Sequence, residues 1–286
     1  MWIESEATKM RDIHFTAGRL PGRAILRVEG PDAGHFLHNL VTSDTEGLTQ
    51  GEARYAALLT PQGKILFDFF VILAGEGYFI DCAASQKSDL LKRLGFYKLR
   101  AKVTIAESGD AAGVSMTEPK AEVRYVDPRT PAIGWRFIDS NGALPDAMGY
   151  EAARIALGLA DTDADLGSGE FFPHEGHFDQ MGGVSFKKGC YVGQEVVSRM
   201  EHRGTARSRI LPVALDGTAP AKGADIRAGE KQVGTLLSSE GNQALAVIRL
   251  DRLAEISGPL LTGALTVTVL KPRWARYDVP GAKDTA

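Results

Sequence analysis

The hydrophobic pattern of the chain changes near residue 207, and this change constrains the fold more than any other feature. Upstream, strand-like apolar runs such as 65–73 alternate with patterns of helical period such as 146–160. Downstream, the chain reads as short β segments in close succession: RILPVAL, KQVGTLLSS, QALAVIRL and ALTVTVLK. Several short strands at this spacing predict a small barrel or sandwich. We therefore expect an α+β body over 1–205 and a β-rich domain over 206–286.

Local signals inside the body predict a hairpin, helices and an acidic loop. EARYAALLT and KILFDFFVIL flank a Pro-Gln-Gly turn at 61–63, which predicts two paired strands. SQKSDLLKRLGFYKL predicts a helix capped by Ser85, and the segment 146–160 predicts another. DTDAD (161–165) lacks the glycine and the glutamate that a calcium loop requires, so we expect a solvated acidic loop there.

Composition and charge exclude several classes of protein. The 286 residues carry 33 Lys and Arg against 36 Asp and Glu, so the surface as a whole does not attract nucleic acid. Cys82 and Cys190 are the only cysteines and lie far apart, which excludes an all-cysteine metal site and disfavours a disulfide framework. The segment 1–15 lacks the apolar core of a signal peptide, and the longest apolar run is too short to span a bilayer. These features predict a soluble protein of a reducing cytoplasm, without a membrane partner.

The stretch KKGCYVGQE, residues 187–195, concentrates the chemistry of the chain. Two lysines precede Cys190, and a helical pattern follows Gly193 and fits a stop at Gly204. A thiol beside ammonium groups and near a helix N-terminus is expected to have a lowered pKa and more thiolate. Over 187–209, six Lys and Arg stand against two Glu, a net charge of +4 that suits an anionic partner.

Other interpretations of these residues stay open. Cys190 is compatible with a small buried apolar side chain, and Glu195 with Arg199 fits an ordinary i,i+4 surface pair. A cysteine–histidine dyad lacks any sequence feature that brings an imidazole to the thiol. His174 and His177 in PHEGH have the spacing of metal ligands, but without a further convincing ligand we predict no metal site.

KGCYVGQE closely resembles the signature of the YgfZ-type folate-binding proteins, a family that includes a mitochondrial iron–sulfur assembly factor. The resemblance extends over most of residues 20–210, while the C-terminal domain is less diagnostic. The matching segments occur in the expected order: FLHNLVTSD (36–44), LLTPQGKILFDFFV, FYKLRAKV and ARIALGLAD.

This family shares its fold with the glycine-cleavage T-protein, an aminomethyltransferase that uses tetrahydrofolate. The resemblance implies an α+β fold, a cloverleaf of α+β subdomains with a C-terminal β-barrel around a folate-sized opening. It implies a tetrahydrofolate-dependent factor in the maturation or repair of iron–sulfur clusters, in particular those of [4Fe–4S] enzymes. The implied ligand is tetrahydrofolate or a polyglutamylated derivative. The implied partners are iron–sulfur assembly proteins or client iron–sulfur enzymes.

The resemblance also assigns roles to residues. Cys190 is expected to be the catalytic residue, accessible at the folate cavity, whereas Cys82, at the end of an apolar strand, is expected to be buried and inert. The acidic tail of the folate is expected to face cations such as Lys188, Arg199 or Arg203. The residues expected to bind folate are Lys188, Gly189, Tyr191, Gly193, Gln194, Glu195, Arg199, Asn39 and Asp44. The last two belong to types that also cap the backbone locally.

Two other functions stay open. In the T-protein, the strand matching GKILFDFFV carries adjacent acidic residues, one of which is used in amine transfer. Here the pair is Phe67–Asp68, so one carboxylate remains, and aminomethyl transfer is the second interpretation. A non-catalytic folate-binding scaffold is the third, and it needs the pocket but no reactive thiol. Nucleic-acid binding through 187–209 is disfavoured because no aromatic residues are interleaved. The sequence does not decide between an enzyme and an assembly factor.

Overall fold

The computed structural model describes residues 13–140, 142, 144–204 and 206–285, which form two compact units. The larger unit contains Phe15–Met148 and Ala160–Ala206. The smaller unit contains residues 13–14, Gly149–Leu159 and the chain from Arg207 onward. The domain boundary between residues 205 and 206, which the sequence led us to expect, stays a prediction.

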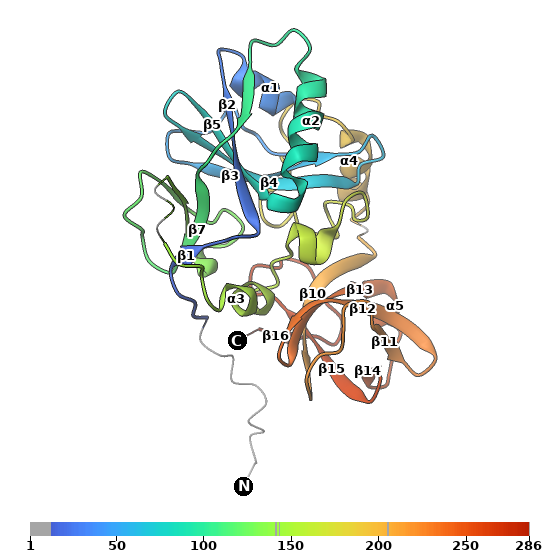
Figure 1. Ribbon diagram of the computed structural model, residues 1–286. Coiled ribbons are helices and arrows are strands. Elements are labelled where there is room, and N and C mark those ends of the chain that lie inside the picture. The colour runs from blue at the N-terminus through green and yellow to red at the C-terminus, as the bar shows by residue number, and fades with distance from the viewer. Residues whose placement is uncertain (1–12, 141, 143, 205, 286) are drawn as a thin grey trace. The chain divides into compact units, whose positions relative to one another are not determined.

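An antiparallel sheet of five strands forms the centre of the larger unit, in the order β3-β4-β5-β2-β6 (Figure 1). Its strands are β2 (Arg23–Glu29), β3 (Ala53–Leu59), β4 (Ile65–Ala74), β5 (Gly77–Ala83) and β6 (Thr104–Glu107). β3 and β4 form the hairpin expected around the turn at 61–63. Gly63 in that turn has φ +81°, a left-handed conformation that glycine adopts without strain.

Helices α1 (Ala33–Leu40) and α2 (Lys87–Lys98) contribute apolar side chains to the core of this sheet (Figure 1). Apolar residues three or four positions apart lie on one face of a helix, which is the pattern that both helices bury. The buried positions are Ala33, Phe36, Leu37 and Leu40 on α1, and Leu90 and Leu94 on α2.

The cap predicted for α2 is wrong. The helix begins at Lys87, after the short 3-10 turn η2 (Ala84–Gln86), and no side chain caps it. The Ser85 hydroxyl instead donates a hydrogen bond of 2.6 Å to the Asp163 carboxylate. A contact between segments far apart in sequence therefore replaces the local one.

The two faces of β4 have different partners because successive side chains of a strand point to opposite faces. Phe67, Phe69 and Val71 belong to the apolar cluster that α1 and α2 complete. Asp68 and Phe70 alternate with them on the other face. Phe70 there packs 5.3 Å from the ring of Tyr55. A strand with two buried faces explains the nearly continuous apolar run in its sequence.

A second antiparallel sheet in this unit has the order β1-β7-β9-β8. Its strands are β1 (Gly18–Arg19), β7 (Ala111–Ser115), β8 (Val123–Val126) and β9 (Trp135–Asp139), with the 3-10 turn η3 (Pro131–Ile133) before β9. Tyr125 and Arg136 of this sheet contact the Phe70 ring, at 6.3 Å between ring centroids and 4.3 Å from guanidinium to centroid. Phe70 therefore links the cores of the two sheets.

The acidic segment 161–165 is not the solvated loop expected from the sequence. It forms most of a π-helical turn, η4 (Thr162–Leu166), in which Thr162 and Asp165 are buried. An Asp165 carboxylate oxygen accepts a hydrogen bond of 2.9 Å from the Asp161 amide. Buried carboxylates of this kind satisfy backbone donors, which is a structural use of acidic residues.

The helix expected over 146–160 is shorter than predicted. The structure has α3 (Tyr150–Ala156), which packs against strands of the smaller unit. Gly149 before it has φ +86°, and Gly158 after it has φ +72°. A left-handed backbone does not continue a right-handed helix, so these glycines bound it.

The smaller unit is a closed barrel, which confirms the β-rich C-terminal domain. Six strands follow the order β10-β13-β12-β11-β14-β15, and pairing of β15 with β10 closes the ring. The strands are β10 (Ser208–Leu215), β11 (Asp225–Ala228), β12 (Lys231–Glu240), β13 (Gln243–Arg249), β14 (Leu260–Thr262) and β15 (Leu265–Lys271). A short helix α5 (Leu250–Leu253) follows β13, and β16 (Lys283–Asp284) adds parallel to β15.

The remaining long helix is α4 (Gln194–Arg203), in the larger unit. It ends at Gly204 with φ +58°, as the sequence predicted. Within the described part of the chain, no helix has the length and apolar character needed to cross a membrane. Residues 1–12, which make up most of the segment in which the sequence predicts no signal peptide, lie outside the described residues.

Candidate functional site

Lys188 anchors the KKGCYVGQE segment, residues 187–195, which we call the signature loop. Its ammonium group donates hydrogen bonds to the carbonyl oxygens of His38, of Val41 at 2.7 Å and of Ser43 at 3.2 Å. Burial lowers the pKa of Lys188 to about 8, although the nearby Asp44 raises it in part. The end of α1 thus forms a cradle of carbonyls around this amine.

The segment after α1 is also paired with the residues that precede the signature loop. The Thr42 hydroxyl donates to the Gly183 carbonyl at 2.6 Å, and the Ser185 amide donates to the Thr42 carbonyl at 2.9 Å. The Ser43 hydroxyl donates to the Gly182 carbonyl at 3.3 Å. The structure therefore brings together two segments that are far apart in the sequence, FLHNLVTSD and KGCYVGQE.

The far end of the signature loop is held by Tyr191 and Gly193. Tyr191 is buried, burial raises its pKa to about 12, and the Lys188 ammonium lies 5.2 Å from its ring centroid. Gly193 has φ +80°, and a Cβ at this position would lie 2.6 Å from the Thr60 carbonyl oxygen. Only glycine fits here, because the backbone is left-handed and the hairpin turn at 61–63 approaches closely.

Cys190 lies between these two anchors and is exposed, whereas Cys82 is buried in β5. Both exposures agree with the expectation from the sequence. Burial raises the pKa of the Cys82 thiol to about 12, so this thiol stays protonated at neutral pH. Of the two cysteines, Cys190 is the one available to an electrophile or a metal.

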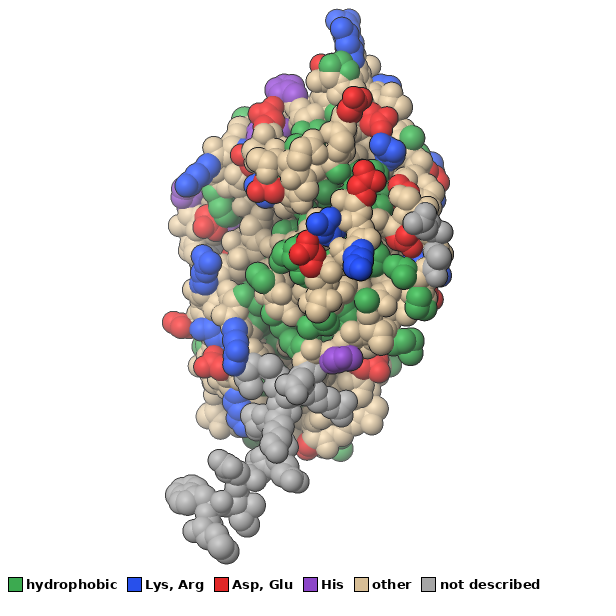
Figure 2. All heavy atoms as spheres, turned by 90° about the vertical axis from the view of Figure 1, so that its left-hand side faces the viewer, with side chains coloured by type: hydrophobic (Ala, Val, Ile, Leu, Met, Phe, Trp, Pro, Cys, Tyr) green, Lys and Arg blue, Asp and Glu red, His purple; other side chains and the backbone are tan. Residues whose placement is uncertain are grey.

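α4 continues from the signature loop and presents its polar side chains outward. Glu195 and Arg199 form an i,i+4 ion pair at 2.5 Å, with both side chains more than half exposed. Arg203 is exposed near the end of the helix. Val197 is the buried residue of α4. Figure 2 shows the face of the molecule that lies on the left in Figure 1, and on that face basic and acidic side chains are interspersed.

The other two predicted folate-binding residues, Asn39 and Asp44, make local contacts. The Asn39 amide lies 2.9 Å from Nε2 of His35, one turn earlier on α1. The Asp44 carboxylate accepts hydrogen bonds from the amides of Glu46 and Gly47, at 3.1 and 3.2 Å. Both residues adjoin the Lys188 cradle. Asp44 caps the backbone locally, whereas Asn39 contacts a side chain of its own helix.

Sequence reasoning missed a buried polar cluster around Asp68. The Tyr55 hydroxyl donates to one carboxylate oxygen at 3.0 Å, and the Thr162 hydroxyl donates to the other. Burial raises the pKa of Asp68, and the nearby Arg23 offsets this only in part. Both oxygens already have protein partners, which is unlike a carboxylate awaiting an amine substrate. In the sequence, this cluster is indicated by Asp68, a single acidic residue inside an apolar strand.

A network of buried ion pairs lies beside that cluster. The Asp81 carboxylate accepts hydrogen bonds from Arg23 and Arg136, each at 2.7 Å, and Asp127 pairs with Arg129 at 2.8 Å. Burial alone would raise the pKa of Asp81, but Arg136 and Arg23 outweigh it and hold the pKa below its usual value. Asp127 and Arg129 are two positions apart, in the turn after β8. The partners of Asp81 come from β2 and β9, so nothing local in the sequence indicates these pairs.

Both histidines of PHEGH are buried, and His177 has φ +64°. Nε2 of His174 lies 3.1 Å from a carboxylate oxygen of Glu201 on α4. The segment before the signature loop is thereby tied to the helix after it.

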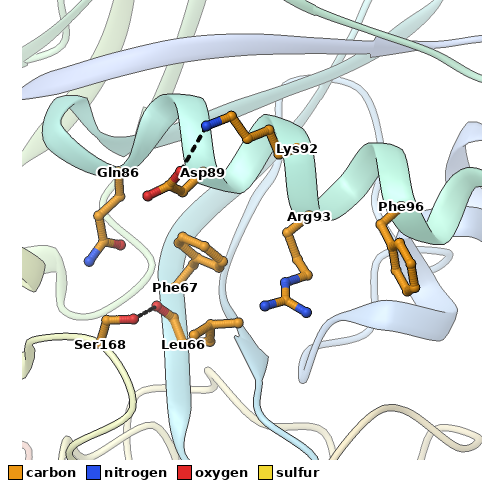
Figure 3. A pocket seen from close by; sticks show the side chains of 8 residues that line it. All are labelled: Leu66, Phe67, Gln86, Asp89, Lys92, Arg93, Phe96 and Ser168. Carbon is orange, nitrogen blue, oxygen red and sulfur yellow. Dashed lines mark hydrogen bonds and ion pairs between the residues drawn. The ribbon is translucent and has the colours of Figure 1, made fainter.

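A pocket of about 570 Å³ opens elsewhere, beside α2 (Figure 3). It is lined by Leu66, Phe67, Gln86, Asp89, Lys92, Arg93, Phe96 and Ser168. In Figure 3, Lys92 reaches toward Asp89, at 3.3 Å, and the Ser168 hydroxyl donates to the Leu66 carbonyl at 3.0 Å. None of the residues expected to bind folate lines this pocket.

Known families match both units of the chain. A family model described as the GCVT N-terminal domain matches residues 23–123, and one described as the CAF17 C-terminal β-barrel domain matches residues 207–277. The solved structure of the glycine cleavage system aminomethyltransferase T of Bartonella henselae is similar, with a TM-score of 0.73 over 92% of this chain and 86% of that chain. At 14% sequence identity this similarity shows the fold alone. It confirms the expected T-protein-like α+β fold with a C-terminal barrel.

Curated relatives share substantial sequence with the chain. The mitochondrial iron–sulfur cluster assembly factor IBA57 of Mus musculus is 34% identical over 92% of this chain and 86% of its own length. The human protein of the same name is 32% identical over 85% of this chain and 79% of its own length. Both are named as mitochondrial proteins, which overturns the cytoplasmic location expected from the sequence. At this identity and coverage, the chain belongs to the family of the IBA57 iron–sulfur cluster assembly factors.

Proposed function

We propose that the protein is a tetrahydrofolate-dependent factor of the YgfZ type that matures or repairs iron–sulfur clusters, in particular those of [4Fe–4S] enzymes. Cys190 is its working thiol. The observation that carries the proposal is the exposure of Cys190 on a loop anchored at both ends. Lys188 holds one end through carbonyl contacts, and Gly193 packs against the Thr60 carbonyl at the other.

The chemistry of a lone thiolate limits what Cys190 does. Iron–sulfur clusters are held by several cysteine thiolates, so one exposed thiol does not hold a cluster by itself. Cys82 is buried and does not supply a second ligand. Cys190 therefore acts as one ligand to iron or to a cluster whose other ligands come from an assembly protein or a client enzyme.

Tetrahydrofolate, or a polyglutamylated derivative, is the proposed ligand beside this thiol. The support is the T-protein-like fold together with the net charge of +4 over residues 187–209. The Lys188 ammonium is occupied by backbone carbonyls, so we assign it to shaping the loop. Arg199 and Arg203, exposed on α4, are the proposed contacts of the folate carboxylates. The rest of the proposed folate-binding set is Gly189, Tyr191, Gly193, Gln194, Glu195, Asn39 and Asp44.

The thiol is tested in cells that lack their own factor of this family. Chains carrying Cys190→Ser or Cys82→Ala are expressed, and the activity of a [4Fe–4S] dehydratase is measured beside that of an iron-free enzyme. We expect Cys190→Ser to abolish restoration of the dehydratase and Cys82→Ala to retain it. If Cys190→Ser restores the dehydratase fully at equal protein level, Cys190 has no role in the activity. The non-catalytic folate-binding scaffold would then be the supported function.

The ligand is tested separately by calorimetry with tetrahydrofolate and its triglutamate. We expect the triglutamate to bind more tightly, with an affinity that falls as salt is added. Arg199→Gln should weaken its binding, whereas the matched change Arg227→Gln, on an exposed arginine of β11, should not. Absence of binding, or binding indifferent to the glutamate tail, would contradict the folate part of the proposal.

A further inference from the structure

We propose that His174, Asp179 and Glu201 form a binding site for one divalent first-row transition metal ion, such as Fe²⁺, Mn²⁺ or Zn²⁺. One ligand atom of each residue lies within 4.8 Å of the others. His174 is 2% exposed, so its ring is held in a defined position. The site goes beyond the proposed function, because neither folate nor Cys190 takes part in it.

The three ligands come from the two segments that flank the signature loop. His174 and Asp179 belong to the loop before it, where the His177 amide donates to the His174 carbonyl at 3.1 Å. The His174 ring packs against Phe186, at 6.1 Å between centroids. Glu201 lies in the last turn of α4, which follows the signature loop. These contacts orient the imidazole before any ion arrives.

The ligand set has the composition of a transition-metal site. One imidazole and two carboxylates suit first-row divalent ions, and three protein ligands leave coordination positions open to water. Two carboxylates around one imidazole also carry net negative charge even when the imidazole is protonated. A divalent cation would neutralise this repulsion between carboxylates.

The spacing requires only a small closure around an ion. Ligand bonds of about 2.0–2.2 Å place any two ligand atoms within about 4.4 Å of each other. The His174–Glu201 separation of 3.1 Å already meets this limit. All three ligand atoms lie within 4.8 Å of one another, and the Glu201 side chain, at 45% exposure, has room to rotate inward. Nε2 of His174 binds the metal in its unprotonated form.

An ion at this site would clip the segment before the signature loop to α4. The chain between His174 and Glu201 contains the whole signature loop with Cys190. Closing that stretch by a metal reduces the conformations open to it. We therefore expect the ion to stabilise the fold around the thiol without contacting the thiol itself.

The experiment is metal titration of the chelator-treated, full-length protein. Calorimetry with Zn²⁺ and spin-resonance detection of Mn²⁺ measure affinity for the chain and for the variants Asp179→Asn, Glu201→Gln and Glu76→Gln. Glu76 is an exposed glutamate in the turn between β4 and β5 and serves as the matched control. We expect one ion per chain, at least tenfold weaker binding in the first two variants, and unchanged binding in the control.

Two further readouts separate the site from a structural hydrogen bond and from Cys190. The ion should raise the melting temperature of the unmodified chain but not that of Glu201→Gln. The Co²⁺ complex should show d–d bands without thiolate-to-cobalt charge transfer. Absence of saturable binding, equal binding by Glu201→Gln, or a thiolate charge-transfer band would each overturn the proposal. His174 is buried, so the two carboxylates carry the test instead of a histidine variant that fails to fold.

Discussion

At the scale of single residues, burial gives identical side chains different chemistry. Cys82 donates weakly to the Ala24 carbonyl, at 3.6 Å, inside an apolar core, and Cys190 stands exposed on the signature loop. Reactivity of a thiol requires both access and the thiolate form. Burial denies Cys82 access, and it also raises the pKa of Cys82 to about 12.

We therefore predict that iodoacetamide modifies only Cys190 in the native protein at neutral pH. Mass spectrometry should find one alkylated cysteine before denaturation and two after it, since the chain has two. The variant Cys190→Ser should show none in the native state. Modification of Cys82 at a comparable rate would mean that β5 opens readily.

Lys188 is the second residue whose environment changes its chemistry. Because burial lowers the pKa of Lys188 to about 8, its ε-carbon resonance should titrate near that pH in NMR of lysine-labelled protein. The variant Lys188→Arg should remove that resonance and so assign it. The unfolded chain binds this proton more tightly, so this residue's contribution to stability rises as pH increases from about 8 toward the ordinary value of 10.5. A midpoint near the ordinary value would contradict the burial of this amine.

At the scale of elements, two glycines of the signature loop differ in what they tolerate. Gly193 has φ +80° and a carbonyl 2.6 Å from the position of a Cβ, whereas nothing lies within 4 Å of a Cβ at Gly189. We predict that Gly193→Ala lowers the free energy of unfolding by about 1–3 kcal/mol, because a left-handed non-glycine residue is strained. Gly189→Ala should change it by less than about 0.5 kcal/mol. Denaturant unfolding of both variants measures this, and equal effects would contradict the packing of Gly193.

At the scale of the whole molecule, buried ion pairs join the two sheets of the larger unit. Asp81 lies on β5 and Arg136 on β9, with both side chains 2% exposed. Removing one partner of such a pair leaves an uncompensated buried charge. We therefore predict that Asp81→Asn destabilises the protein by about 3–5 kcal/mol. The matched change Asp225→Asn, in an exposed pair with Arg227, should alter stability by less than about 1 kcal/mol.

The same network predicts the response to acid. For Asp81 and Asp127, burial raises the pKa, but arginines outweigh it, so both folded-state pKa values lie below the ordinary 3.8. Their stabilisation is present above the unfolded-state pKa and is lost as pH falls through the folded-state values. Thermal unfolding between about pH 5 and pH 2 should show this loss, and Asp81→Asn should show less of it. An unchanged pH profile in that variant would contradict the prediction.

Features that depend on neighbours along the chain could be predicted from the amino-acid sequence. The β3–β4 hairpin, the end of α4 at Gly204 and the β-rich C-terminal domain follow from turn residues and periodicity, which act locally. A prediction from neighbouring residues was wrong where a side chain bonds to a partner far away in the sequence. The Ser85 hydroxyl does not cap α2 and instead donates a hydrogen bond to Asp163, 78 positions away.

The candidate site, in contrast, depends on contacts between residues far apart in sequence. The Lys188 amine meets the Val41 carbonyl 147 positions away, and His174 meets Glu201 across the signature loop. The arginines around Asp81 come from strands that no local pattern connects. Such contacts form because a buried charge or polar group must find a partner wherever the packed chain offers one. That requirement acts on positions in space, which a single sequence does not contain.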